Sequence, residues 1–180
     1  LFSNHFLFIG NPGTGKTTVA RIISRIFCSL GVLPKGHLVE TDREGLVSGY
    51  VGQTGIKTKS VIDKSIGGTL FIDEAYALVR GKDSNDFGKE ALDILVKRME
   101  DCRGKFIVIA AGYSDEMDEF LKSNSGLQSR FSKIFRFDDS FKIQQIDLDY
   151  DQADKILVKV RDEAHRFANS YRKEQMKKGL

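Results

Sequence analysis

The sequence predicts a three-layer α/β sandwich built on a parallel β-sheet. Over the first 139 residues, apolar runs of strand length alternate with segments of helical periodicity, which is the pattern of strands joined by helical crossovers. The run at residues 69–72 is followed by two acids and is almost wholly apolar, which is typical of a strand covered on both faces. The 180 residues, 41% hydrophobic and 29% charged, suffice for one buried core.

Glycines and short apolar runs set the bounds of each element. Gly31 ends the first helix, and Gly67 with Gly68 ends the second. Glycines recur around Tyr50 in the segment 45–55, which predicts a mobile loop. Strands are expected at residues 6–9, 37–40, 69–74, 106–111 and 134–137. Helices are expected at residues 16–30, 56–66, 87–99 and, after Tyr113, up to about residue 122.

A phosphate-binding loop is expected between the first strand and the first helix. Residues 10–17 have the pattern G-x-x-x-x-G-K-T, in which glycines let backbone N–H groups turn toward an anion at a helix N-terminus. Lys16 would neutralise the β- and γ-phosphates of a nucleotide. The nucleotide-binding residues expected here are Pro12, Gly13, Thr14, Gly15, Lys16, Thr17 and Thr18. The alternative is a glycine-rich turn that binds nothing.

Two acids follow the apolar run at residues 69–72, at the strand end where doubly wound sheets bind ligands. Asp73 fits a ligand of hydrated Mg²⁺, together with the Thr17 hydroxyl. Glu74 fits the base that polarises an attacking water. The alternative is a strand that ends in two solvated acids. Together with the phosphate loop, the pair predicts a site that hydrolyses a nucleotide.

Several stretches resemble the AAA+ ATPases, in the branch of stage V sporulation protein K and the red-type Rubisco activase. These are GNPGTGKTT, LVSGYVGQTGIKTK, GGTLFIDEAYAL, DFGKEALDILVKRMED, VIAAGY and GLQSRF. The resemblance implies a P-loop NTPase core with sheet order 5-1-4-3-2, ATP or ADP with Mg²⁺, and in full-length relatives a ring that remodels a protein substrate. It implies that Lys16, Asp73 and Glu74 are catalytic, that Arg130 is an arginine finger, and that Tyr50 lies on the pore loop.

Both of the last two assignments have an alternative. Arginine keeps its charge and pairs well with phosphate oxygens, but Arg130 would also serve as a solvated surface charge. Tyr50 would also serve as an aromatic that covers the core. Two positions depart from the wider family: Gln128 replaces a second arginine, and Tyr113 stands where a polar sensor asparagine is usual.

The C-terminal tail differs from that family. We expect a core at residues 1–139 and a tail at 140–180 that packs on the core or on a partner chain, with an extended piece and a long helix at about 152–176 in place of the helical lid. The segment around His165 resembles the last helix of the UvrC nuclease domain, where this histidine belongs to a metal-dependent site. Because the segment with its two aspartates is absent, we expect His165 to be a packing or surface residue.

The sequence therefore favours an ATP- or ADP-binding AAA+ core. We expect weakened affinity and little or no turnover, because the N-terminal segment and the lid of the family are absent from this sequence. The alternatives are a recombined or engineered chimeric scaffold and a nucleic-acid-processing enzyme. A net charge of +3 is weak support for nucleic acid as a partner. No apolar run approaches a membrane span, and Cys28 and Cys102 form no metal motif, which favours a cytoplasmic protein.

Overall fold

The computed structural model describes residues 5–81, 87–131 and 133–137, with Val158 and Asp162. Five strands form one sheet, in which every neighbouring pair is parallel. The strands are β1 (Phe6–Ile9), β2 (Leu38–Thr41), β3 (Thr69–Ile72), β4 (Ile107–Gly112) and β5 (Lys133–Arg136). Their order is β2-β3-β4-β1-β5, so the expected order 5-1-4-3-2 is confirmed.

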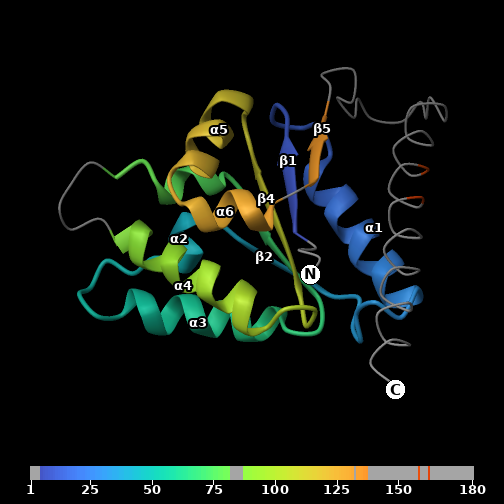
Figure 1. The fold of residues 1–180 in the computed structure, drawn as a ribbon, viewed down its shortest axis with the longest axis horizontal. Coiled ribbons are helices and arrows are strands. Elements are labelled where there is room, and N and C mark those ends of the chain that lie inside the picture. Colours follow the sequence, from blue (N-terminus) through green and yellow to red (C-terminus); the bar gives the residue numbers. More distant parts are fainter. Residues whose placement is uncertain (1–4, 82–86, 132, 138–157, 159–161, 163–180) are drawn as a thin grey trace.

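Helices cover both faces of this sheet (Figure 1). The α-helices are α1 (Lys16–Ser29), α2 (Arg43–Leu46), α3 (Thr54–Ser65), α4 (Phe87–Asp101), α5 (Ser114–Lys122) and α6 (Ser125–Arg130). A 3-10 helix, η1 (Ala75–Leu78), follows β3. The three-layer α/β class is therefore confirmed.

Alternate side chains along the strands enter two separate cores. In β1, Phe6 and Phe8 pack with α1, whereas Leu7 and Ile9 join the core under α3 to α6. Each of these four side chains is at most 3% exposed. Burial on both faces explains the nearly continuous apolar runs, because a parallel sheet between helices leaves no strand face in water.

Some sequence boundaries are corrected by the structure. The segment expected to be a loop at 45–55 begins inside α2, and α3 starts at Thr54 rather than at residue 56. Helix α2 forms because the Asp42 side chain accepts a hydrogen bond from Gly45 N–H at 2.8 Å and Leu46 is fully buried. The short helix η1 was not expected, since four residues carry too little periodicity to reveal it.

The expectations for the tail fall almost entirely outside the described residues, including the stripe of the long helix and His165. Val158 and Asp162 are helical and exposed. Within the ranges described above, no helix combines the length and the apolar character needed to cross a membrane.

Candidate nucleotide site

The loop between β1 and α1 is shaped as an anion cradle. Gly13 and Gly15 have φ angles of 77° and 83°, a region that favours glycine. Gly15 is the N-cap of α1 and no side chain caps that helix end, so its first N–H groups are left for another acceptor. At Gly10, an added Cβ would lie 2.7 Å from the Cβ and the carbonyl oxygen of Phe137, so the residue that follows β5 packs tightly against the loop.

The Lys16 side chain turns back onto this loop. Its Nζ donates to the carbonyl oxygens of Gly10 and Asn11, both at 2.8 Å. Burial lowers the pKa of Lys16 from its ordinary value, while the carboxylates of Asp73 and Glu74 oppose that shift. A phosphate in the cradle would therefore meet an ammonium group that the loop already holds in place.

The two acids lie at the carboxyl end of β3. The Asp73 N–H donates to the Thr41 carbonyl at 2.8 Å, and the Asp73 Oδ1 accepts from the Glu74 N–H at 3.0 Å. Glu74 has φ 46° and ψ 44°, and among the described residues it is the one non-glycine residue with a positive φ. Strain of this kind collects at functional sites, where the surrounding structure maintains it.

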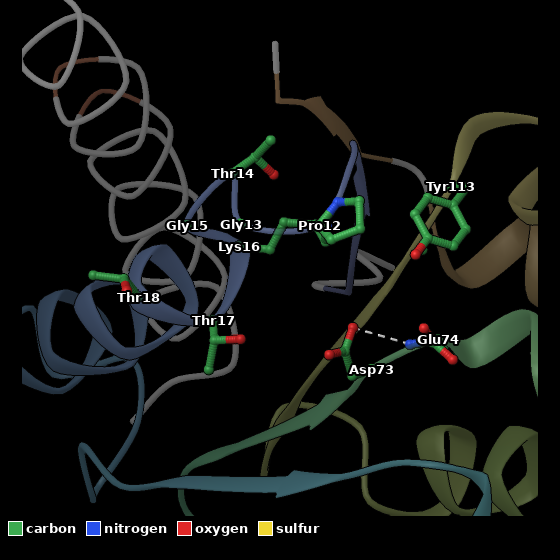
Figure 2. A pocket seen from close by; sticks show the side chains of 11 residues that line it. Pro12, Gly13, Thr14, Gly15, Lys16, Thr17, Thr18, Asp73, Glu74 and Tyr113 are labelled. Carbon is green, nitrogen blue, oxygen red and sulfur yellow. Dashed lines mark hydrogen bonds between the residues drawn. The ribbon is translucent and has the colours of Figure 1, made fainter. Parts of the chain in front are cut away.

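The loop and the acids line one cavity of about 350 Å³. Figure 2 shows the side chains of the loop on one side of this space and those of Asp73, Glu74 and Tyr113 on the other. The lining residues are Pro12, Gly13, Thr14, Gly15, Lys16, Thr17, Thr18, Asp73, Glu74, Gly112 and Tyr113. The structure therefore brings together all the expected loop residues and both acids, and it adds Gly112 and Tyr113.

Tyrosine side chains border the Glu74 carboxylate. Burial raises the pKa of Tyr76 to about 12, with further contributions from the Glu74 charge, from Tyr113 and from a hydrogen bond to Glu74, while Arg80 acts in the opposite direction. The Arg80 guanidinium lies 4.4 Å from the centre of the Tyr76 ring, and the rings of Tyr76 and Tyr113 are 5.6 Å apart. Tyr76 is thus a neutral donor beside Glu74, which the sequence had not singled out.

The donors in the cavity fit a nucleotide with a hydrated divalent ion. The uncapped end of α1 and Lys16 offer positive groups to phosphate, and Thr17 and Asp73 offer oxygen ligands. In the described part of the chain, no three histidine, cysteine or acidic side chains gather to hold a metal ion. A Mg²⁺ ion here would therefore need phosphate oxygens and water among its ligands.

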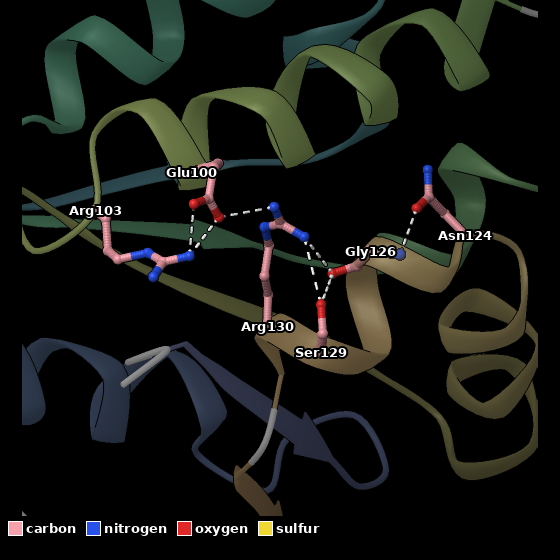
Figure 3. A network of polar contacts seen from close by, with 6 residues as sticks. All are labelled: Glu100, Arg103, Asn124, Gly126, Ser129 and Arg130. Atoms are coloured by element: carbon pink, nitrogen blue, oxygen red, sulfur yellow. Dashed lines mark hydrogen bonds and ion pairs between the residues drawn. The ribbon is translucent and has the colours of Figure 1, made fainter. Parts of the chain in front are cut away.

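Arg130 does not line this cavity. Its Nη2 donates to Glu100 Oε2 at 3.0 Å, and its Nη1 donates to the Gly126 carbonyl at 2.9 Å (Figure 3). Glu100 also accepts a hydrogen bond from Arg103, and this bond is the main reason that the pKa of Glu100 lies below its ordinary value. The Arg130 side chain is 19% exposed, so the alternative of a freely solvated surface charge does not describe it.

Tyr50 projects from the loop between α2 and α3. It is 73% exposed, and its neighbour Val51 is 86% exposed. The alternative in which Tyr50 covers the core is therefore wrong, because a covering side chain would be largely removed from water.

A glycine-rich loop entering α1, opposite two acids at the carboxyl edge of a parallel sheet, defines the class of P-loop nucleotide-binding proteins. The family model "ATPase family associated with various cellular activities (AAA)" matches residues 6–139. The chain belongs to this family, and it carries an AAA ATPase domain.

Known proteins of the family are similar over the same region. Stage V sporulation protein K of Bacillus subtilis (strain 168) is 59% identical over 135 residues, which are 75% of this chain and 42% of that protein. ESX-1 secretion system protein EccA1 of Mycobacterium tuberculosis (strain ATCC 25618 / H37Rv) is 51% identical over 138 residues, or 76% of this chain and 24% of that protein. The chain thus spans less than half the length of these relatives.

A solved structure supports the fold. The FIGL-1 AAA domain in complex with ADP superposes with a TM-score of 0.53 at 20% identity, covering 75% of this chain and 43% of that one. At this identity the similarity concerns the arrangement of strands and helices.

Proposed function

We propose that the cavity binds ATP or ADP with Mg²⁺ and that its residues hydrolyse ATP. The observation that carries this proposal is the convergence of the loop residues 12–18 and the two acids of β3 on one cavity. Membership of the AAA family supports it further.

Each group has a chemical role that its position supports. The uncapped N–H groups of α1 and the Lys16 ammonium bind the phosphates. Thr17 and Asp73 would hold Mg²⁺, which supplies charge neutralisation at the β- and γ-phosphate oxygens when bound. The Glu74 carboxylate takes a proton from a water whose oxygen forms the new bond to the γ-phosphorus, while the bond from that phosphorus to the ADP oxygen breaks.

We further propose that Arg130 acts on the site of a neighbouring copy in a ring. Its absence from the cavity of its own chain supports this. Because Arg130 is paired with Glu100, it would have to be released from that carboxylate before it could reach a phosphate. Turnover of an isolated chain is then low, because its own cavity lacks the finger.

The exposed Tyr50 and Val51 side chains are proposed to contact a protein segment. Two large apolar groups in water are more typical of an interaction site than of a solvated loop. A cytoplasmic location stays a prediction from the sequence.

Calorimetric titration with Mg·ADP tests the binding proposal. Lys16→Ala should weaken binding at least about tenfold, because a charge-assisted contact to phosphate is worth about 1.4 kcal/mol or more. Lys97→Ala, at an exposed lysine of α4, is the matched control and should bind as the parent does. Equal affinity in the parent and in Lys16→Ala contradicts the assignment of the loop.

A further inference from the structure

The exposed loop that carries Tyr50 is anchored firmly at its base. The Thr58 hydroxyl donates to the Leu46 carbonyl at 2.9 Å, and the buried Thr54 hydroxyl accepts from the Ser48 N–H at 3.0 Å. The loop is therefore tied to the first turns of α3, while its tip stands in water. A displacement of α2 or α3 should therefore move the tip of the loop, because these hydrogen bonds join both ends of the loop to the two helices.

Lys57 adds a second tie between the two helices. Its Nζ donates to the carbonyl oxygens of Glu44 and Val47, at 2.6 and 3.0 Å. Both carbonyls belong to α2 or to the residue directly after it. Together with the hydrogen bonds of Thr54 and Thr58, these contacts connect α2 and the base of the loop to the start of α3.

At its other end, α2 begins beside the proposed nucleotide site. The Asp73 N–H donates to the carbonyl of Thr41, the last residue of β2. The next residue, Asp42, caps α2 through its hydrogen bond from Gly45 N–H. The backbone of Asp73, which lines the cavity, is thus hydrogen-bonded to Thr41, and Thr41 directly precedes the residue that caps α2.

Arg43 closes a second connection to the same site. Its Nη1 donates to the Ala77 carbonyl at 2.7 Å, across 34 positions of sequence. Ala77 belongs to η1, and its own N–H donates to the Glu74 carbonyl at 2.8 Å. A single residue of η1 is therefore bonded both to the strained Glu74 and to the first residue of α2. Because Arg43 is half-buried, water screens its hydrogen bond to the Ala77 carbonyl less than it would at the surface.

We propose that Arg43 is a positioning residue that couples the state of the nucleotide site to the exposed loop of Tyr50 and Val51. The inference rests on the proposed binding of ATP and ADP at the cavity. Contacts made to the γ-phosphate alone would shift Glu74 and η1, the Ala77 carbonyl would carry Arg43 with it, and Lys57 would pass the movement of α2 to the loop. Such coupling is reciprocal, so a protein segment on the loop would change the nucleotide affinity by the same factor.

The absence of tryptophan from the chain allows a clean test. Tyr50→Trp places a single indole on the loop, and its emission is recorded with Mg·ADP and with Mg²⁺ and a non-hydrolysable ATP analogue. The emission of the two bound states should differ. Adding Arg43→Met, which removes the guanidinium and keeps most of the stem, should reduce that difference at least about twofold while both nucleotides still bind. Adding Arg25→Met, at an exposed arginine of α1, should leave it unchanged.

Calorimetry on the same proteins separates the outcomes. If the nucleotides bind but the two emissions are the same, or if Arg43→Met keeps the full difference, the coupling is overturned. If neither nucleotide binds to the parent, the proposed function is overturned and the coupling with it. If circular dichroism shows that Arg43→Met does not fold, Lys57→Met breaks the next connection and should give the same loss, and a full difference in that variant overturns the coupling.

Discussion

Arg130 is held by Glu100 of its own chain, with 3.0 Å between Nη2 and Oε2. The two residues lie 30 positions apart, on α6 and α4. An arginine proposed to reach the neighbouring copy is thus already paired in the single chain. The contact that Arg130 makes within the chain therefore differs from the one proposed for it in an assembly.

We expect Arg130→Ala to lower ATP turnover at least about tenfold with little change in nucleotide affinity, because a finger stabilises the transition state of the neighbouring site. Turnover per chain of the parent should rise with protein concentration. Both are measured by phosphate release over a dilution series. Arg103→Ala removes the other partner of Glu100 and is the matched control.

Glu100→Gln tests the pairing from the other side. Without the carboxylate, Arg130 should be released more easily, so turnover should be no lower than in the parent. A loss as large as that of Arg130→Ala would contradict this expectation and would indicate that turnover needs the Glu100 carboxylate to hold Arg130 in place.

Glu74→Gln should reduce turnover by about 10²–10⁴-fold and leave the affinity for Mg·ATP nearly unchanged, because the amide keeps the shape and loses the base. Single-turnover kinetics and calorimetry check the two parts. Glu119→Gln, on an exposed position of α5, controls for the change of charge. Full turnover in Glu74→Gln would assign the base to another residue.

The positive φ of Glu74 has a consequence for stability. Glu74→Gly should be more stable than Glu74→Ala by about 1 kcal/mol, because glycine adopts the left-handed region without the cost that a Cβ carries. Denaturant unfolding of the two variants measures the difference. If Glu74→Ala is the more stable of the two, the greater chain entropy of unfolded glycine outweighs the strain at this position.

His5 should make the fold sensitive to acid. It is buried, its Nδ1 accepts from the Val108 N–H at 2.9 Å, and burial lowers its pKa from 6.5 to about 3, with Arg130 and Arg103 adding repulsion. Between pH 6.5 and 3 the unfolded chain binds a proton at His5 that the folded chain does not, so the free energy of unfolding falls as the pH falls, by up to about 1.4 kcal/mol for each pH unit.

His5→Gln provides the comparison, since glutamine does not titrate. The stability of the parent relative to His5→Gln should decrease from pH 7 to pH 5 in denaturant melts. A difference that stays constant over this interval would show that His5 titrates alike in the folded and the unfolded chain.

Local pattern was sufficient to predict much of the fold and the positions of the loop and the acids. The glycine spacing of residues 10–15 and the apolar run before Asp73 report backbone conformation and burial directly, because each depends on neighbours in sequence. The order of the strands came from the resemblance to a family, and the structure confirms it.

Tertiary structure alone decided the contacts between distant segments. The pairing of Arg130 with Glu100, the bond from Arg43 to Ala77 and the position of Tyr113 in the cavity join residues that are far apart in the chain. The left-handed backbone of Glu74 is imposed by its surroundings against the preference of the residue. Such features depend on which side chains the fold brings within a few ångströms, and no periodicity along the chain encodes that proximity.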